Sequence, residues 1–421
     1  MIALVFVALV VGAHFYLWHR MVRSATRPGR ARKALTWGLV GLVLLVVAAF
    51  AGTRMELGNW LAWPGYLWVA LMFYLVVFLL VLEVPRAVAS MLIRRGERGA
   101  VAVASPVQEP VPAVASAPAP SEPATGPATG PATEPAVASA PAPTMSRRLF
   151  LGRTTAAVAG VGALGTVGYG MTSALGDPVL EPVRVRLPKL DPRLNGLRFA
   201  VVSDIHLGPL TGVGHTERIV RMINGLRPDV VAIVGDLVDG SVAQLGALAK
   251  PLKSLESRYG AYFVTGNHEY YTQNGPQEWI EELDQLGVRS LRNERVEISH
   301  QGAVLDLAGV NDLNGEAVGD GPDFAEALGG RTPGRSTVLL AHQPVQVDQA
   351  AGFGVDLQLS GHTHGGQIAP FNLVVGLQQP VVSGLATIDG VQVYVTRGAG
   401  FWGPPVRVGA PPEITMLELH S

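Results

Sequence analysis

Histidine, aspartate and asparagine recur in short, glycine-containing motifs along the second half of this 421-residue chain. The densest motif is Gly361-His362-Thr363-His364, in which one residue separates the two histidines. Residues two apart in an extended segment point to the same side, so both imidazoles could face one site. Imidazole nitrogens and carboxylate oxygens bind divalent metals, and the pattern therefore suggests a metal site. A polar turn with hydrogen-bonded histidines is the alternative for this motif alone.

Four further motifs precede it, each expected where a strand ends. They are Asp204-x-His206, Gly235-Asp236, Gly266-Asn267-His268-Glu269 and His342. A turn, a helix cap or a buried histidine would explain any one of them singly. Because the carboxyl ends of strands form the ligand crevice of α/β sheets, we expect the whole series to converge. A carboxylate such as Asp236 can bridge two cations, which together bind a phosphoryl group and activate water.

The segments between the motifs alternate between strand-like and helix-like patterns. Strands are expected at 197–203, 229–234, 261–265, 296–299, 304–310, 337–341, 357–359, 392–396 and 414–419, and helices at 217–226, 243–258 and 276–286. Asp389-Gly390 between apolar residues marks a tight hairpin. Early β-α-β alternation followed by hairpins predicts a mixed α/β sandwich over residues 177–421.

The complete motif series resembles that of the calcineurin-like metallophosphoesterases, and the resemblance covers most of the carboxy-terminal half of the chain. It implies two mixed β-sheets flanked by helices, and two divalent metal ions. The implied ligands of the first ion are Asp204, His206, Asp236 and His364. Those of the second are Asp236, Asn267, His342 and His362. Asn267 and His268 would also contact the phosphate, with His268 as the general acid; support of Asn267 is the alternative role for His268.

Within the family, Ser203 to Gly208 and the glycine-rich 397–402 are similar to bacterial membrane-associated or exported members. Arg397 and Arg407 could therefore bind the substrate phosphate, and a solvent-facing loop is the alternative for Arg407. Three histidines of residues 177–421 lie outside every motif and are expected at the surface. They are His215, His300 and His420.

The resemblance implies hydrolysis of a phosphomonoester or phosphodiester by a metal-bound hydroxide, with Asp236 and His268 as the catalytic residues. Manganese, iron or zinc suit a site rich in imidazole and carboxylate ligands. One alternative is a membrane sensor that binds a phosphorylated ligand without turnover. The complete series of metal ligands and His268 counts against it, because a binding module does not need every residue required for hydrolysis. Another is a pyrophosphatase of nucleotide-linked lipid precursors, which would require the domain on the cytoplasmic face.

Composition separates the first half of the chain from the second. Hydrophobic residues make up 48% and charged residues 15%, and the mean hydropathy of +0.30 is too high for an ordinary soluble protein. The net charge of -1 predicts no nucleic-acid partner. The absence of cysteine excludes disulfides, thiolate metal sites and cysteine nucleophiles.

Three apolar runs predict a transmembrane region with three helices in residues 1–99. The runs are 2–18, 34–51 and 66–82. Basic residues stand on one side of every crossing, at Arg20, Arg23, Arg27, Arg30, Arg32, Lys33, Arg86, Arg94, Arg95 and Arg98. Trp60 and Trp63 suit the opposite interface, so the basic loop is expected in the cytoplasm and the amino terminus outside.

Residues 100–145 are rich in proline and alanine and predict a disordered linker. The segment 146–176 begins Ser146-Arg147-Arg148 and resembles a twin-arginine export signal or a fourth transmembrane segment. A crossing there would place residues 177–421 outside the cytoplasm, whereas a packed or interfacial helix would leave them inside. We therefore expect a multi-pass protein of the cell membrane, with a lipid- or envelope-derived phosphate ester as substrate and the twin-arginine export machinery as a partner.

Overall fold

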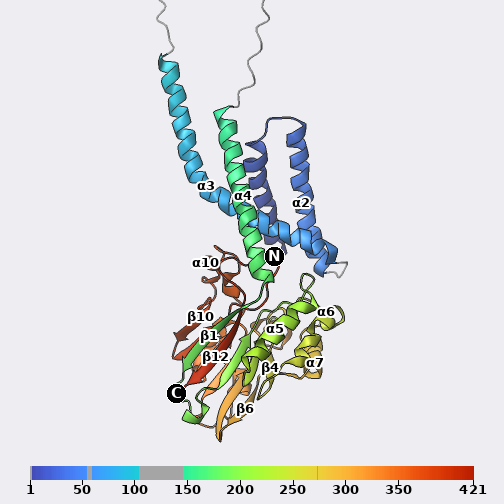
Figure 1. Ribbon diagram of the computed structural model, residues 1–421, viewed down its shortest axis with the longest axis vertical. Coiled ribbons are helices and arrows are strands. Elements are labelled where there is room, and N and C mark those ends of the chain that lie inside the picture. Colours follow the sequence, from blue (N-terminus) through green and yellow to red (C-terminus); the bar gives the residue numbers. More distant parts are fainter. Residues whose placement is uncertain (1, 55–58, 104–145, 273) are drawn as a thin grey trace, which may run out of the picture.

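The computed structural model describes residues 2–54, 59–103, 146–272 and 274–421. A helical amino-terminal part stands on a carboxy-terminal domain built from two β-sheets (Figure 1). The linker predicted at 100–145 lies outside the described residues, apart from the end of one helix. The two parts are joined without a break, because the last helix of the first part leads directly into the first strand of the second.

The apolar runs of the amino-terminal part form long helices. They are α1 (Ile2–Leu17), α2 (Arg30–Arg54), α3 (Ala62–Val103) and α4 (Arg147–Leu175). Three of them, α2, α3 and α4, are long and apolar enough to cross a membrane. The helix α1 has 16 residues, about 24 Å, and continues as a π-helical turn over Trp18–Arg23. In Figure 1, α3 crosses the other helices obliquely and then bends; it contains Pro85, which interrupts the helical hydrogen bonding.

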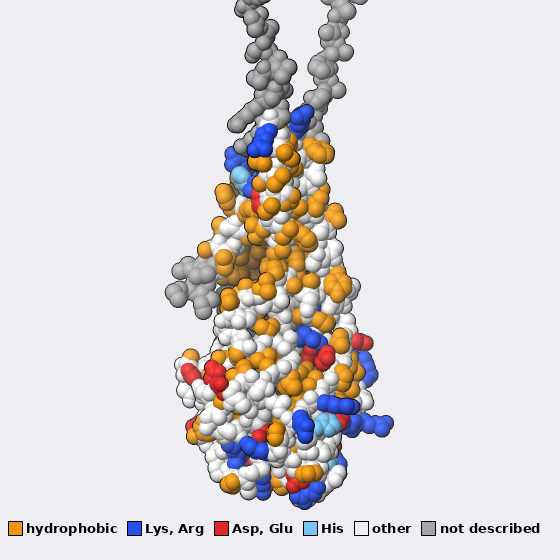
Figure 2. Space-filling model, turned by 90° about the vertical axis from the view of Figure 1, so that its left-hand side faces the viewer, with side chains coloured by type: hydrophobic (Ala, Val, Ile, Leu, Met, Phe, Trp, Pro, Cys, Tyr) orange, Lys and Arg blue, Asp and Glu red, His pale blue; other side chains and the backbone are white. Residues whose placement is uncertain are grey.

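The helical part has a basic end and an end that touches the carboxy-terminal domain. At the start of α4, Arg153 donates to the carbonyl of Ala25 in the basic loop. Near its other end, the Gly170 carbonyl accepts from the backbone of Arg407. Figure 2 shows Lys and Arg gathered at the end far from the domain and hydrophobic side chains covering the length between. This arrangement agrees with the charge asymmetry of the sequence.

The carboxy-terminal domain consists of two six-stranded mixed sheets. The strands of the first, in spatial order, are β1 (Val179–Arg186), β12 (Glu413–His420), β2 (Arg198–Val202), β3 (Val230–Val234), β4 (Ala261–Val264) and β5 (Val288–Ser290). Those of the second are β10 (Gly384–Ile388), β11 (Val391–Val395), β9 (Leu357–Ser360), β8 (Thr337–Leu340), β7 (Ala303–Gly309) and β6 (Glu294–His300). The predicted sandwich is therefore confirmed. The sequence patterns missed β1 and β5, and they indicated β10 only through the hairpin turn that follows it.

Three apolar layers hold the domain together. One lies between the two sheets and includes Phe199, Val234 and Leu340. A second lies between the first sheet and its covering helices, which are α5 (Val213–Leu226), α6 (Val242–Ala249) and α7 (Gln277–Gln285). The third lies between the second sheet and α8 (Phe324–Leu328) and α9 (Val347–Gly352). A short helix, α10 (Asn372–Val375), lies near the helical part (Figure 1).

Parallel pairing sets the position of the site. The strands β2, β3 and β4 run parallel, and so do β7, β8 and β9. The sequence motifs follow the carboxyl ends of β2, β3, β4, β8 and β9. The loops that carry them therefore meet at one edge of the sandwich.

Candidate metal centre

The structure brings all seven predicted ligand residues together at this edge. Five of them have positive φ angles between 49° and 70°: Asp204, His206, Asp236, His362 and His364. Left-handed backbone at residues other than glycine costs on the order of 1 kcal/mol each and is concentrated at functional sites. The surrounding sheets thus hold the backbone of these five residues in an energetically unfavourable conformation.

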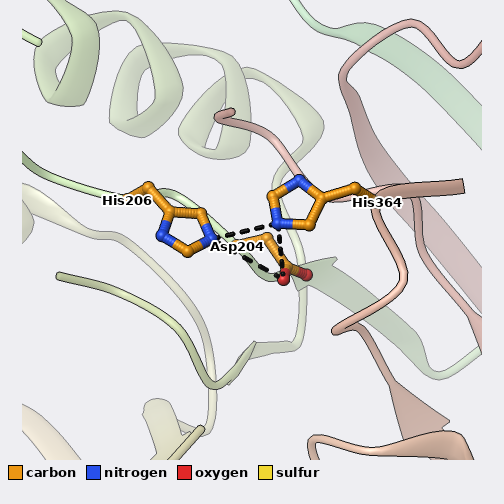
Figure 3. Close-up of side chains that lie close together, drawn as sticks. All are labelled: Asp204, His206 and His364. Carbon is orange, nitrogen blue, oxygen red and sulfur yellow. Dashed lines mark hydrogen bonds and ion pairs between the residues drawn. The ribbon is translucent and has the colours of Figure 1, made fainter. Parts of the chain in front are cut away.

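The first group consists of Asp204, His206 and His364 (Figure 3). The Nε2 atoms of the two histidines lie 3.0 Å apart, and Asp204 Oδ1 lies 3.2 Å from His364 Nε2. The outer atoms are bonded elsewhere: Asp204 Oδ2 accepts from the backbone of His362, and His206 Nδ1 donates to Asp239. These bonds fix the side chains and leave one donor atom of each facing inward.

The second group consists of Asp236, His342 and His362, with Asn267 beside them. His342 Nδ1 donates to the Val234 carbonyl, and His342 Nε2 lies 3.2 Å from Asp236 Oδ2. His362 Nδ1 lies 2.8 Å from Asn267 Oδ1. The inward atoms are therefore two imidazole nitrogens, a carboxylate oxygen and an amide oxygen.

Asp236 stands between the two groups. Its Oδ2 atom lies 3.8 Å from His206 Nε2 and 3.2 Å from His342 Nε2. Its Oδ1 atom accepts from the backbone of His268 at 2.9 Å. One oxygen thus fixes the carboxylate while the other faces both groups, as a bridging ligand would.

The donor atoms fit divalent metal ions. Ligand atoms that are each about 2.1 Å from one ion lie about 3–3.5 Å from one another. The two pairs that include His364 Nε2 have such separations, and so does the pair of Asp236 Oδ2 and His342 Nε2, whereas Asp204 Oδ1 and His206 Nε2 lie 4.0 Å apart. Asp204 Oδ1 and His342 Nε2 are buried and make no hydrogen bond to any residue that the structure describes. Buried polar atoms without a hydrogen bond are costly, and cations would satisfy both.

The electrostatics keep two of the histidines in the form that binds metals. Burial lowers the pKa of His362 to about 3. Burial and the neighbouring guanidinium of Arg407 hold the pKa of His364 well below its ordinary value. Both imidazoles are therefore neutral at neutral pH, with a lone pair available to a cation.

His268 is charged rather than neutral. It donates through Nδ1 to Asp239 Oδ1 at 2.7 Å, and its ring lies edge-on to His206 with centroids 4.6 Å apart. Burial would lower its pKa, but the carboxylates of Asp236 and Asp239 outweigh burial and raise that pKa to about 9. His268 therefore carries a proton at neutral pH, at the edge of a cavity.

Two acidic residues of the site were not assigned a function from the sequence. Asp239 accepts hydrogen bonds from both His206 and His268. Its position three residues after Asp236, in the segment after β3, was the signal available in the sequence. Glu269 is fully buried and accepts from the backbone N–H groups of Asp236, Leu237, Val238 and Gly266. Its carboxylate thus joins the loops after β3 and β4, and burial and Asp236 raise its pKa to about 7.

The two arginines expected to bind substrate are engaged within the protein. Arg407 is 0% exposed and donates to the carbonyls of His364, Arg397 and Gly400. One of its nitrogens lies 3.1 Å from His364 Nδ1. Arg397 forms ion pairs with Glu413 at 2.7 Å and Glu181 at 3.2 Å. In this arrangement neither guanidinium faces the cavity, and Arg407 instead supports the loop of His364.

The expectation that the remaining histidines lie at the surface was wrong for two of them. His215 is 9% exposed and His300 is 6% exposed. His215 lies on the inner face of α5, and His300 lies 2.8 Å from the Tyr259 hydroxyl. Both are parts of the core that no motif marks.

A cavity of about 630 Å³ opens over His206, Asp239 and His268. Residues of both the helical part and the carboxy-terminal domain line it. The other lining residues are Phe50, Thr53, Tyr66, Gly208, Pro209, Leu210, Thr211, Gly240, Ser241, Gln244, Tyr271, Thr272, Phe401, Trp402 and Gly403. Phe50 and Thr53 belong to α2 and Tyr66 to α3, so helices of the apolar region border the candidate site.

Comparisons with known proteins agree with this geometry. A family model described as calcineurin-like phosphoesterase matches residues 197–366. The chain is 41% identical over 262 residues to a transmembrane protein with a metallophosphoesterase domain from Danio rerio, and the match covers 60% of each chain. It is 39% identical over 262 residues to an uncharacterized metallophosphoesterase of Helicobacter pylori, covering 61% of this chain and 68% of that protein. A metallophosphoesterase of Aquifex aeolicus is 33% identical over 246 residues, which cover 58% of this chain and 92% of that one.

Proposed function

Because this chain belongs to the calcineurin-like metallophosphoesterases, we propose that it is a dinuclear, metal-dependent hydrolase that cleaves a phosphomonoester or phosphodiester. The observation that supports two ions is the position of Asp236, whose Oδ2 atom faces a donor of each group, at 3.8 Å and 3.2 Å. A single ion would leave one group of inward donors unused.

The proposed ligands divide as the motif series implied. Asp204, His206, Asp236 and His364 would hold one ion. Asp236, Asn267, His342 and His362 would hold the other. When bound, manganese, iron or zinc would polarise the phosphoryl oxygens and lower the pKa of coordinated water. The protein would keep the donors in place through the outer hydrogen bonds of His206, His342 and Asp204.

His268 is the proposed general acid. It is protonated at neutral pH, borders the cavity and is oriented by Asp239. From this position it would donate a proton to the oxygen of the leaving group. Asp239 would act by holding His268 in the right orientation and by stabilising its charged form.

We also propose that α2, α3 and α4 cross the cell membrane, together with α1 as the first apolar run predicts, and that the domain at 177–421 lies outside the cytoplasm. The basic loop and the start of α4 share one end of the helical part, and the domain is attached at the other end. Positive charge marks the cytoplasmic end of membrane helices. Ala159, Ala163 and Val167 of α4 are buried among residues of α3, which supports retention of α4 as a transmembrane segment after any export step.

Substitution of the bridging carboxylate tests the proposed mechanism. In full-length protein in detergent, Asp236→Asn should lower manganese-dependent hydrolysis of bis(4-nitrophenyl) phosphate at least about 100-fold and lower the bound metal per chain. Asp348→Asn, at an exposed position on α9, is the matched control and should change neither quantity. Unchanged hydrolysis in Asp236→Asn would refute the mechanism.

A further inference from the structure

The cavity over the proposed catalytic residues is bordered by the ends of two apolar helices. Phe50 and Thr53 are in the last turns of α2, and Tyr66 is in the second turn of α3. The rings of Phe50 and Tyr66 meet edge-on, with centroids 5.1 Å apart. On the side of the domain, Trp402 borders the same cavity and its ring centroid lies 6.2 Å from that of His268. An aromatic surface therefore leads from His268 to the helical part.

This wall is a fixed part of the molecule because α4 is packed tightly against the domain. The Gly170 carbonyl accepts from the backbone of Arg407 at 2.9 Å. A Cβ at Gly170 would lie only 2.5 Å from the Val406 side chain, so only glycine permits this approach. Val406 is itself fully buried among residues of α3 and α4. The loop that supports His364 and the helical part are thus packed as one unit.

The lining of the cavity is aromatic or neutral, with few charges. Among the residues that the structure describes, its lining contains no lysine or arginine, and Asp239 is its only carboxylate. Among the described lining residues, His268 is therefore the one side chain that offers a positive charge to a phosphate, and the second phosphate of a nucleoside diphosphate would find no further one there. Thr211, Ser241 and Gln244 make part of the lining polar but uncharged, which suits a neutral polar headgroup. The Thr211 hydroxyl also bonds to the backbone of Gly208, and the Gln244 side-chain oxygen accepts from the backbone of Ser241.

A second apolar feature lies on the same face of the domain. Exposed side chains around α10 include Phe371 at 45%, Leu373 at 72% and Leu377 at 86%. In Figure 1, α10 is at the end of the domain that faces the helical part, level with the lower end of α4. A run of exposed large apolar side chains is costly in water and favourable at the acyl boundary of a bilayer. Both features indicate that this face of the domain lies against the membrane surface.

We propose that the substrate is a membrane lipid that carries a single phosphate ester. Its phosphate would lie at His206 and His268, its neutral headgroup among the hydroxyl groups, and its acyl chains along Phe50 and Tyr66 toward the bilayer. This inference rests on the proposed function and names the substrate class of that same site. It disfavours nucleotide-linked lipid precursors, which carry a diphosphate.

A chain-length series of short-chain lipids tests the inference. Full-length protein in detergent with manganese is assayed on dibutyryl, dihexanoyl and dioctanoyl forms of phosphatidylglycerol and phosphatidic acid. We expect kcat/KM to rise at least tenfold from dibutyryl to dioctanoyl for the diester, the monoester or both, which also shows which ester is cleaved. Dioctanoyl CDP-diacylglycerol should be cleaved more slowly than the better single-phosphate lipid.

Substitutions in the helical wall of the cavity test whether this wall causes the dependence of kcat/KM on acyl length. Phe50→Ala and Thr53→Phe should each reduce the dioctanoyl-to-dibutyryl ratio of kcat/KM at least fivefold. Leu44→Ala, at an exposed position on α2 outside the cavity lining, should keep the wild-type ratio. The use of a ratio separates this effect from partial misfolding, which would lower both rates together.

The assays distinguish failure of the proposed function from failure of the lipid inference. If wild-type protein hydrolyses neither bis(4-nitrophenyl) phosphate nor 4-nitrophenyl phosphate with any of the three metals, the proposed function itself fails. If it hydrolyses either ester but shows no dependence on acyl length, prefers CDP-diacylglycerol, or keeps its ratio in both wall variants, only the lipid inference is overturned.

Discussion

Asp239 binds His268 through a hydrogen bond of 2.7 Å to Nδ1. The same carboxylate oxygen accepts from His206 Nδ1 at 2.8 Å. One side chain therefore orients both the proposed general acid and a proposed metal ligand. It also stabilises the charged form of His268, whose pKa is raised to about 9.

Replacing Asp239 by asparagine should lower kcat by about 10–100-fold, the range typical of groups that orient ligands. It should also change the pH profile. An acid is active while protonated, and that form disappears as the pH rises through its pKa. Without the Asp239 charge the pKa of His268 falls from about 9, so the alkaline limb of kcat/KM should move to lower pH. An alkaline limb that stays in place would contradict the assignment of His268.

The two histidines of the Gly361–His364 motif should have separable effects. His362 lies beside Asn267, whereas His364 lies beside Asp204 and His206. Each alanine variant should lower activity at least about 100-fold. Anomalous scattering on crystals of each variant soaked in manganese should show weaker occupancy at a different position. Loss of the same position in both variants would disprove the proposed division of ligands.

Arg407 should matter for stability more than a surface arginine. It is fully buried and donates to several backbone carbonyls, so Arg407→Ala leaves those acceptors without partners and should lower the free energy of unfolding by about 3–5 kcal/mol. Arg335→Ala, which removes the ion pair with the exposed Glu297, should cost less than about 1 kcal/mol. Thermal unfolding of the full chain in detergent compares the two. Equal losses would mean that burial of Arg407 contributes nothing.

His215 should make the fold sensitive to acid. Burial lowers its pKa from 6.5 to about 4, so the unfolded chain takes up a proton at a higher pH than the folded chain does. The free energy of unfolding should therefore fall by about 3 kcal/mol between pH 6.5 and pH 4. Denaturant unfolding at several pH values should show a weaker pH dependence of the free energy of unfolding in His215→Gln than in the wild-type protein. Identical pH dependence in His215→Gln and the wild-type protein would exclude His215 as the cause.

Membrane topology is testable with reporters fused after Leu175. In a bacterial host, alkaline phosphatase should be active there, because it folds only outside the cytoplasm, and a fluorescent protein at the same position should stay dark. The same reporters placed in the basic loop after Arg27 should give the opposite result. A fluorescent fusion after Leu175 would place the catalytic domain in the cytoplasm.

Much of the site could be predicted because its proposed metal ligands occur in short local sequence motifs. The seven proposed ligands each follow a strand whose apolar residues are recognisable, and parallel strands must direct their carboxyl ends to one edge. The two-sheet architecture followed from the same alternation of strands and helices. Strand β5 was missed because it has only three residues, too few to establish a period.

The remaining features depend on tertiary contacts that no local pattern reports. Arg407 resembles any arginine in a glycine-rich segment, and only the fold shows that it is buried beside His364. His215 lies on a helix face that becomes internal when α5 covers the first sheet. Phe50 and Tyr66 line the cavity although they precede the first motif by more than a hundred residues, so no local pattern connects them with the site.

The shared cavity wall affects how this protein should be prepared for inhibitor discovery. A fragment that begins at Asp177 would keep all the proposed ligands but would lack Phe50, Thr53 and Tyr66. Its cavity would have a wider mouth than that of the intact chain. Compounds selected on such a fragment would be shaped to an opening that the full-length protein does not offer, and compounds that exploit the helical wall would be missed.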